Sequence, residues 1–250
     1  MSSRSTPTPG STPTSGASPT RGAVSPRVVI LPSPLLGPAS YLPLAGLLRD
    51  GGLPTVVASL PAGEVMPGGV LHAFGRVTDH HEATLFVAHS NAGYYAPALA
   101  TARDLPVVYL DAALPAPGVA ETRLAPASFA EFIETLPLTD GVLPPWPSWW
   151  DRTEVAALFP NDDWLDRVTR EAPRLPPDYF TTPLPVPSGW EARPAAYLGF
   201  GDTYAEELTR AEGLGWVVRR EAGHHLAHLA EPARVADLLL GLLHALATPR

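Results

Sequence analysis

Short apolar runs alternate along the chain with segments whose apolar positions recur at helical spacing. The runs are predicted as strands, and they cover residues 27–31, 54–59, 84–88, 106–110, 195–200 and 216–218. Helices are predicted between and after them, over residues 41–50, 94–103 and 205–211 and from about residue 231 onwards. Buried Val-, Ile- and Leu-rich strands that alternate with helices are typical of a parallel sheet covered on both faces. The sequence therefore predicts an α/β fold with a mostly parallel sheet.

This alternation is interrupted over residues 114–189, which are rich in proline and contain or adjoin five of the six tryptophans, from Trp146 to Trp190. Two short helices are predicted in this small insertion, which we interpret as a lid. The density of aromatic residues predicts an apolar pocket. Trp146, Trp149 and Trp150 are candidate substrate-binding residues, although each of them could instead pack the insertion onto the sheet.

The segment 84–93, TLFVAHSNAG, predicts a strand, a sharp bend that carries Ser90, and a helix. Such a bend presents a hydroxyl at the carboxyl end of a strand. It also directs the first amides of the helix towards the group that the hydroxyl attacks. Serine is a weak nucleophile unless a base and an orienting acid activate it. Without those partners, Ser90 would be an ordinary helix N-cap.

A candidate base lies near the C-terminus, where a short strand, a turn at Gly223, two adjacent histidines and a helix beginning near Pro232 follow one another. The serine and histidine segments together resemble those of the α/β-hydrolase superfamily, whose nucleophile elbow usually reads G-x-S-x-G. The resemblance implies the order serine, acid, histidine along the chain. It implies Ser90 as the nucleophile and His224, directly after Gly223, as the base, with His225 as its neighbour.

The elbow departs from the usual pattern at both glycine positions. Ala88 and Ala92 occupy them, and Gly93 follows one place later. Alanine is small enough for such a turn, so the difference does not contradict the resemblance.

Two aspartates are candidates for the orienting acid. Asp202 follows the strand predicted over residues 195–200, where the superfamily usually carries its acid. The alternative is Asp111, at the end of the strand predicted over residues 106–110, because some members carry the acid there. Either carboxylate would hold the histidine in the tautomer that accepts the serine proton. Asp202 is the first choice.

The expected oxyanion hole has one unusual position. The backbone amide of Asn91, the residue after the nucleophile, is one candidate donor. The second normally comes from the loop after the first strand, where Pro32 and Ser33 stand in place of the usual His-Gly. The matching residue is Pro34, which has no N–H. Either Leu35 donates from a shifted loop or the hole is incomplete, and a missing donor costs roughly 10²–10³ in rate.

Composition narrows the function classes. A chain of 250 residues can form one domain with a full core, and a net charge of −8 without a basic cluster argues against nucleic acid as a partner. There is no lysine and no cysteine, which excludes Schiff-base and thiol chemistry. No dinucleotide-binding glycine loop is present, and no cofactor is expected. The run His80, His81, Glu82 does not indicate a metal site, because adjacent residues of an extended strand point to opposite faces.

Residues 1–26 are rich in Ser, Thr, Pro and Gly and are predicted to form a disordered tail before a domain over residues 27–250. The tail lacks the apolar region of a signal peptide, and no apolar run is long enough to span a bilayer. We therefore expect a cytoplasmic enzyme that does not contact membranes. Its oligomeric state is left open.

These observations predict a serine hydrolase that cleaves an ester, thioester or lactone of a moderately sized apolar substrate through an acyl-enzyme. Two alternatives remain at this stage. One is a lyase, cyclase or acyltransferase that uses the same Ser-His pair. The other is a ligand-binding protein of the same fold without turnover.

Overall fold

The computed structural model describes residues 26–60, 63 and 65–247. Its main sheet has the strand order β2-β1-β3-β4-β7-β8, and every neighbouring pair of strands is parallel. These strands are β1 (Val28–Leu31), β2 (Thr55–Val57), β3 (Leu85–Ser90), β4 (Val107–Ala112), β7 (Ala195–Phe200) and β8 (Val217–Glu221). The predicted α/β class with a parallel sheet is confirmed.

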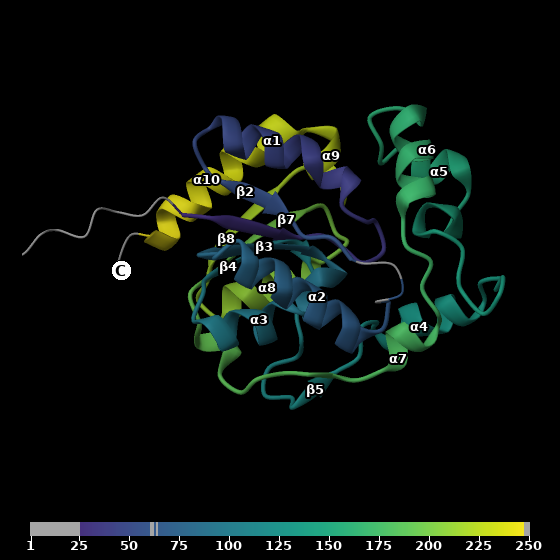
Figure 1. Ribbon diagram of the computed structural model, residues 1–250, viewed down its shortest axis with the longest axis horizontal. Coiled ribbons are helices and arrows are strands. Elements are labelled where there is room, and N and C mark those ends of the chain that lie inside the picture. Colours follow the sequence, from purple (N-terminus) through teal and green to yellow (C-terminus); the bar gives the residue numbers. More distant parts are fainter. Residues whose placement is uncertain (1–25, 61–62, 64, 248–250) are drawn as a thin grey trace, which may run out of the picture.

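Helices cover both faces of this sheet, as Figure 1 shows. One face is covered by α1 (Leu42–Asp50), α9 (Ala227–Ala230) and α10 (Pro232–Ala247), and the other by α2 (Pro67–His80), α3 (Ala96–Arg103) and α8 (Ala205–Gly213). All residues of β1, β3, β4 and β7 are buried, because helices pack on both of their sides. Strands buried on both faces need no alternation of apolar and polar residues, which is why they appear as continuous apolar runs in the sequence.

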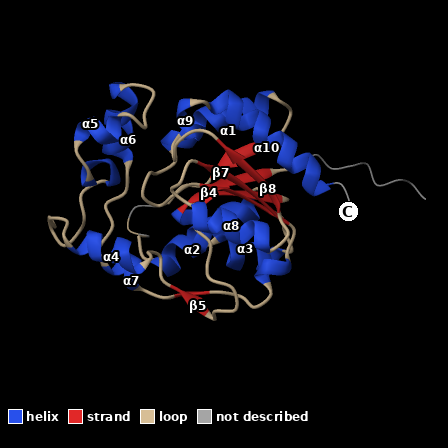
Figure 2. Cartoon of the chain, turned by 180° about the vertical axis from the view of Figure 1, so that it is seen from behind, coloured by secondary structure: helices blue, strands red, loops and turns tan. Residues whose placement is uncertain are grey.

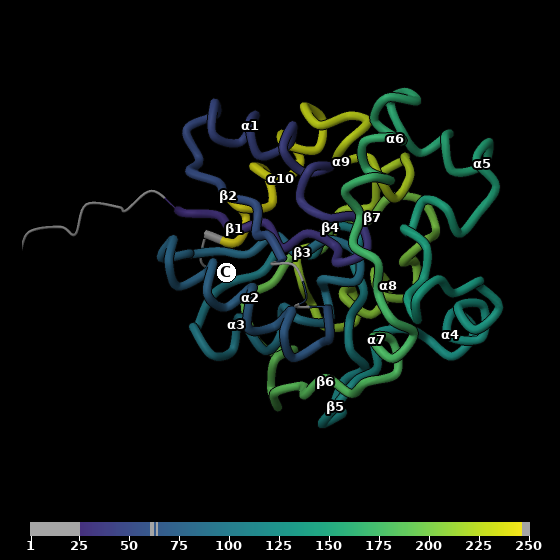
Figure 3. Tube along the Cα trace, turned by 45° about the vertical axis from the view of Figure 1, so that its right-hand side comes forward, coloured from purple at the N-terminus to yellow at the C-terminus, as the bar shows by residue number. Residues whose placement is uncertain are grey.

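The chain between β4 and β7, which we call the insertion, covers residues 113–194, slightly more than the predicted 114–189. Its helical elements between residues 127 and 181 lie beyond the carboxyl ends of the strands, whereas its small antiparallel strand pair lies past the layer of α2 and α3 (Figures 1 and 2). A small antiparallel sheet pairs β5 with β6, which lie side by side in Figure 3 although they are far apart in the sequence. The elements of the insertion are β5 (Glu121–Thr122), α4 (Ala127–Glu134), η3 (Trp146–Trp149), α5 (Arg152–Ala156), α6 (Asp162–Glu171), α7 (Asp178–Thr181), β6 (Leu184–Pro185) and η4 (Trp190–Ala192).

The predicted and observed elements differ most clearly after Ser90 and in the insertion. The segment after Ser90 is a 3₁₀ turn, η2 (Asn91–Tyr94), followed by α3, instead of one continuous helix over residues 94–103. The insertion contains α4 and α7 in addition to the two short helices that were expected. The tail predicted over residues 1–26 lies outside the described residues, apart from Pro26. Among the described residues, no helix has the length and apolar character needed to cross a membrane.

Candidate active site

Ser90 ends β3 in a strained backbone conformation, with φ at 56° and ψ at −132°. A non-glycine residue in such a conformation costs about 1–3 kcal/mol, so the surrounding structure must impose it. Here β3 is buried along its whole length, and the Ser90 carbonyl accepts a hydrogen bond of 3.1 Å from the Ala113 N–H. The result is the predicted sharp bend, which turns the Ser90 side chain out of the sheet at the end of the strand.

Gly93 explains how this turn tolerates alanine at the usual glycine positions. A Cβ atom on Gly93 would lie only 2.0 Å from the Ala113 carbonyl oxygen, whereas the side chains of Ala88 and Ala92 are buried without such a conflict. The close approach between the turn and the chain after β4 therefore occurs at Gly93. The glycine that stands one place late in the sequence is the one that the packing requires.

Ser90 is hydrogen bonded to His225 and, through it, to Asp111. The Ser90 Oγ lies 3.0 Å from the His225 Nε2, and the His225 Nδ1 lies 2.6 Å from the Asp111 Oδ2. A carboxylate can only accept, so Nδ1 carries the ring proton and Nε2 is left to accept the proton of the Ser90 hydroxyl. Ser90 and Asp111 are 4% and 1% exposed, whereas His225 between them is partly exposed at the cavity.

The carboxylate that is hydrogen bonded to His225 is that of Asp111, not that of the first candidate, Asp202. In the pairing of β3 with β4, His89 lies opposite Leu110 and Ser90 lies opposite Ala112, so Asp111 is an extra residue on β4. It has a positive φ of 42°. Such a bulge redirects a side chain, and here the other carboxylate oxygen of Asp111 accepts a 2.9 Å hydrogen bond from the Phe200 N–H.

Asp202 lies in the turn after β7, where its side chain is exposed and its backbone carbonyl accepts a hydrogen bond from Ala205. No hydrogen bond joins it to either histidine of the His224-His225 pair. The structure places Asp111 next to His225 because β4 is the immediate neighbour of β3 in the sheet and the bulge on β4 directs the Asp111 side chain towards the end of β3.

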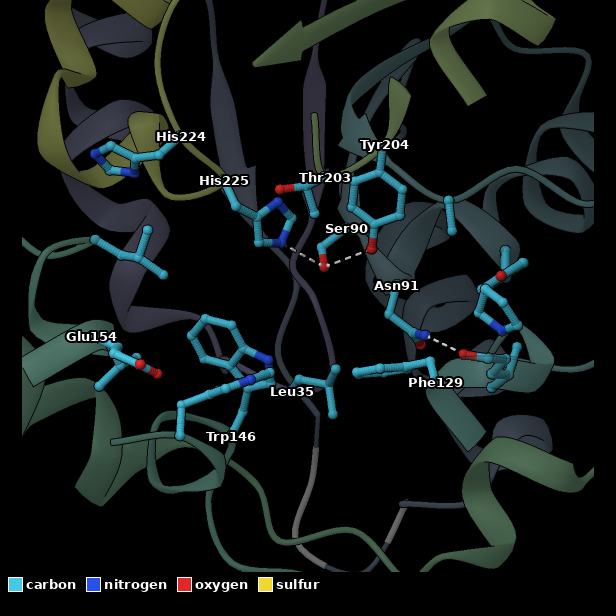
Figure 4. Close-up of a pocket in the computed structure, with 17 residues that line it drawn as sticks. Leu35, Ser90, Asn91, Phe129, Trp146, Glu154, Thr203, Tyr204, His224 and His225 are labelled. Carbon is cyan, nitrogen blue, oxygen red and sulfur yellow. Dashed lines mark hydrogen bonds between the residues drawn. The ribbon is translucent and has the colours of Figure 1, made fainter. Parts of the chain in front are cut away.

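The histidine that contacts Ser90 is His225, not His224. In Figure 4 the two side chains point in different directions, and the His224 ring is turned away from Ser90. Its Nδ1 accepts a long hydrogen bond of 3.3 Å from the Leu226 N–H, within its own turn. Burial lowers the pKa of His224 below its ordinary value. Because neighbouring residues in a turn project differently, only one of the pair can face the serine.

A second series of hydrogen bonds, which the sequence did not reveal, ends at the backbone carbonyl of His225. The Ser33 N–H donates to the Tyr41 hydroxyl at 2.8 Å, and this hydroxyl donates to the His89 Nδ1 at 2.7 Å. The His89 Nε2 donates in turn to the His225 carbonyl at 3.0 Å, and the two imidazoles stack with 4.6 Å between their centroids. The series fixes the backbone of His225. The one sequence signal for it was a polar residue, His89, at the end of a strand that is otherwise apolar.

His228 lies next to this series and is also buried. Both of its ring nitrogens lack a hydrogen-bond partner within the described part of the molecule. Its ring stacks on that of Tyr41 with centroids 4.5 Å apart and lies 4.3 Å from that of His89. Burial, more than any other cause, lowers the pKa of His228 to about 3 and holds the pKa of His89 well below its ordinary value. Both rings are therefore neutral at neutral pH.

The two predicted oxyanion donors, Asn91 and Leu35, both border the cavity at Ser90. The Leu35 N–H makes a long hydrogen bond of 3.3 Å to the Ser33 Oγ. The Asn91 side chain is directed at the insertion, since its Nδ2 donates to the Leu124 carbonyl at 2.7 Å and its Oδ1 accepts from Tyr179. It ties the turn at Ser90 to the insertion, and the backbone amide of Asn91 is the donor that this residue can offer at Ser90.

The cavity above Ser90 has a volume of about 510 Å³ and is enclosed jointly by the sheet and the insertion (Figure 4). Trp146 and Trp150, two of the three predicted substrate-binding residues, line it. Trp149 does not. It packs on Phe180 at 6.0 Å and donates a hydrogen bond to the Pro144 carbonyl, inside the insertion. The lining residues are Leu35, Ser90, Asn91, Tyr94, Ala113, Leu124, Pro126, Phe129, Trp146, Trp150, Glu154, Val155, Leu158, Thr203, Tyr204, His224 and His225.

No group of three or more His, Asp or Glu side chains that could hold a metal ion occurs among the residues that the structure describes. In particular, His80 and His81 contact each other edge to face and belong to no such group.

A parallel sheet whose inner strand ends in a strained serine, with an acid on the next strand and a histidine after the last one, is the architecture of the α/β-hydrolase fold. Comparison with known proteins agrees. No protein-family model matches the sequence, and a search of curated proteins finds no match. Solved structures do match, and they establish that this chain has the α/β-hydrolase fold.

Three of these structures illustrate the likeness. An extracellular α/β-hydrolase from a Paenibacillus species, described as sharing structural and functional homology with tobacco salicylic acid binding protein 2, has a TM-score of 0.69 at 16% identity, covering 87% of this chain and 99% of the other. A variant of tomato methylketone synthase I in complex with β-ketoheptanoate has a TM-score of 0.67 at 15% identity, with 89% and 99% covered. A bromoperoxidase from Bacillus anthracis has a TM-score of 0.62 at 12% identity, with 88% and 92% covered.

Proposed function

We propose that the protein is a serine hydrolase that cleaves an ester, thioester or lactone of a moderately sized apolar substrate. The observation that carries this proposal is the hydrogen-bonded series Ser90, His225, Asp111, with distances of 3.0 Å and 2.6 Å. The series stands at the base of a cavity large enough for a small substrate. This geometry matches the requirement for a nucleophile, a base in contact with it, and a third group that orients the base.

In the proposed reaction the Ser90 Oγ attacks the substrate carbonyl carbon while His225 takes the serine proton at Nε2. Asp111 holds the imidazole in the required tautomer and stabilises the imidazolium. The negative charge that develops on the carbonyl oxygen is held by the backbone amide of Asn91, and the predicted second donor, Leu35, could contribute only from a loop shifted away from the Ser33 Oγ. His225 then protonates the leaving group, and a water molecule that it activates hydrolyses the acyl-enzyme.

The character of the cavity supports an apolar substrate. Apart from the catalytic groups, it is bordered mainly by aromatic and aliphatic side chains, including Phe129, Trp146 and Trp150. No arginine is among the described residues that line it, so the cavity lacks the guanidinium group that typically binds a carboxylate or phosphate. A cavity of this size and lining is typical of sites that bind small apolar molecules.

The experiment that tests the proposal is reaction of the purified protein with a fluorophosphonate probe, together with p-nitrophenyl esters of increasing chain length. We expect the wild type to be labelled and to turn the esters over. Ser90→Ala and His225→Ala should abolish labelling and lower turnover by roughly 10⁴-fold or more. His224→Ala is the matched control, and it should keep its labelling, with turnover within roughly tenfold of the wild type, because its side chain is turned away from Ser90.

A non-hydrolytic lyase, cyclase or acyltransferase is the second candidate. One observation favours it: the Leu35 amide is directed at the Ser33 Oγ, which leaves the oxyanion site short of a backbone donor. One structural neighbour, methylketone synthase I in complex with a β-keto acid, is a protein of this fold that is not named as a hydrolase. Labelling of Ser90 without turnover of any ester would favour this second function. Absence of both labelling and turnover would favour a binding protein.

A further inference from the structure

The region around Ser90 lacks one conventional hydrogen-bond donor. Pro34, at the position that usually contributes an amide, has no N–H. The Leu35 N–H points at the Ser33 Oγ at 3.3 Å and, as a backbone group, cannot rotate to another acceptor, and the Asn91 side chain is directed at the insertion. Of the conventional donors, the Asn91 backbone amide is therefore the one that remains free to meet a developing oxyanion.

Tyr204 brings a hydroxyl to the same place from a different element. It precedes α8, and its side chain lines the cavity with the hydroxyl turned inward, 3.4 Å from the Ser90 Oγ. In Figure 4 the Ser90 Oγ lies between the His225 ring on one side and the Tyr204 hydroxyl on the other, with Asn91 on the Tyr204 side. The phenol is thus on the side of the nucleophile away from the base, next to the residue that supplies the remaining amide.

The state of the phenol suits a donor. Burial raises the pKa of Tyr204 above its ordinary value, so the hydroxyl keeps its proton at neutral pH. At 3.4 Å the contact with the Ser90 Oγ is long for a hydrogen bond between hydroxyls, which ordinarily measures about 2.7–2.8 Å. A group held this loosely can turn to a better acceptor when a substrate carbonyl arrives.

We propose, on the basis of the hydrolase function above, that Tyr204 donates a hydrogen bond to the substrate carbonyl oxygen and replaces the amide that Pro34 cannot supply. As the Ser90 Oγ bonds to the carbonyl carbon, the π electron pair moves onto the oxygen and the serine proton passes to the His225 Nε2. Tyr204 keeps its own proton throughout, and its hydrogen bond shortens because the acceptor becomes charged. When the oxyanion collapses, the carbon–leaving-group bond breaks and His225 protonates the departing oxygen.

Two other roles for Tyr204 make different predictions. A donor to the leaving group would matter for a poor leaving group such as an alkoxide and hardly at all for p-nitrophenolate. A phenol that only orients the Ser90 hydroxyl would affect the attack but would not contribute to the affinity for a stable tetrahedral adduct. The oxyanion role predicts the same loss for both kinds of ester and a matching loss of affinity for the adduct.

The test is Tyr204→Phe, which removes only the hydroxyl, assayed on the p-nitrophenyl and ethyl esters of one apolar acid and with a trifluoromethyl ketone of the same chain length. We expect kcat/KM to fall roughly 10²–10³-fold on both esters, mainly through kcat, and the affinity for the ketone to fall by a similar factor. Tyr109→Phe is the control: Tyr109 is a buried tyrosine of β4 outside the cavity and stacks on Trp216. It should stay within about threefold of the wild type.

The outcomes are distinct. A loss below about threefold, a loss confined to the ethyl ester, or a loss with unchanged ketone affinity would each overturn the oxyanion role. Failure of the wild type to react with the probe or with any ester would instead contradict the hydrolase function itself. An active wild type with an equally active Tyr204→Phe variant would contradict only the role of Tyr204.

Discussion

The sheet and the insertion enclose the same cavity but build their sides of it by different means. On the sheet side, the positions of Ser90 and Asp111 follow from backbone geometry: a strained residue at the end of β3 and a bulge on β4. On the insertion side, the wall consists of aromatic side chains packed on one another, such as Trp146 and Trp150 with centroids 5.1 Å apart. Backbone geometry restricts the positions of Ser90 and Asp111 to a narrow range. The shape of the aromatic wall, by contrast, depends on which side chains the insertion carries. Under the proposed function, the sheet would therefore position the reacting groups, and the insertion would shape the part of the cavity that receives the substrate.

Asn91 is where the two regions meet. Its backbone belongs to the turn after Ser90, and its side chain is hydrogen bonded to the insertion at Leu124 and at the Tyr179 hydroxyl. The Tyr179 hydroxyl in turn accepts a 3.0 Å hydrogen bond from Tyr95. The insertion is therefore anchored next to Ser90, so a change in its packing can alter the geometry at Ser90 through this residue.

The largest expected effect is on kcat, and it comes from replacing Asp111, the carboxylate on the sheet side of the cavity. Asp111→Asn keeps an acceptor for the Phe200 N–H but favours the wrong tautomer of His225, and kcat should fall by roughly 10⁴-fold. Asp202→Asn, in the exposed turn after β7, is the matched control and should stay within about threefold of the wild type. Steady-state kinetics with a p-nitrophenyl ester measures both variants. If Asp202→Asn shows the larger loss, Asp111 is not the acid.

Two neighbouring tryptophans test the insertion side. Trp149 is 7% exposed and packs inside the insertion, so Trp149→Ala should lower the free energy of unfolding by about 3–5 kcal/mol. Trp150 is 36% exposed and lines the cavity, so Trp150→Ala should cost about 1 kcal/mol or less but raise KM for long-chain esters. Urea unfolding and chain-length profiles separate the two effects. A shared loss of stability would show that the cavity wall and the packing of the insertion are one unit.

A smaller effect concerns the buried histidines behind the site, where His228 faces Tyr41, His89 and His225. Burial lowers the pKa of His228 to about 3, against about 6.5 in the unfolded chain. Below pH 6.5 the unfolded state binds a proton that the folded state does not. As the pH is lowered from 6.5 towards 3, this difference in proton binding at His228 should therefore reduce the free energy of unfolding by about 1.4 kcal/mol per pH unit.

His228→Leu removes this contribution, so its free energy of unfolding should decline less steeply than that of the wild type between pH 6.5 and 4.5. Urea unfolding at several pH values measures the slopes. His72→Gln, at an exposed position of α2, is the control and should leave the slope unchanged. Parallel curves for His228→Leu and the wild type would mean that His228 takes up a proton in the folded state.

Sequence reasoning was sufficient for the sheet and for the position of Ser90. Continuous apolar runs define buried parallel strands, and a serine between such a strand and a turn of small residues is typical of a nucleophile elbow. It was not sufficient for the partners of Ser90. The choice between His224 and His225 depends on which way each side chain leaves a turn. The choice of Asp111 depends on a bulge that no periodicity encodes. Tyr204 and His89 carried no motif at all.

In the insertion, too, the sequence predicted the kind of site but not which residues form it. The density of tryptophan predicted an apolar pocket, and Trp146 and Trp150 do line the cavity while Trp149 does not. Within one short stretch, which ring faces the cavity is decided by the 3₁₀ turn η3 and by the packing of Trp149 on Phe180. The composition of the insertion therefore predicts that an apolar pocket exists, whereas tertiary packing decides which tryptophans line it.

The smallest expected effect concerns charge on the insertion side of the cavity. Glu154 is the acidic residue of the insertion that lines it, and Figure 4 shows this side chain on the Trp146 side, away from Tyr204. Glu154→Gln should leave a neutral p-nitrophenyl ester almost unaffected. It should improve kcat/KM for the half-ester of a dicarboxylic acid of equal length by about two- to fivefold, because an exposed charge acts weakly through solvent.

The gain should shrink as salt is added, since screening reduces the repulsion that the variant removes. Glu131→Gln, an exposed residue of α4 that does not line the cavity, is the matched control and should change neither substrate. An equal gain on the neutral and the anionic ester would mean that Glu154 acts through the shape of the cavity. In that case the insertion would select substrates by packing alone, and the contrast with the sheet side would be sharper.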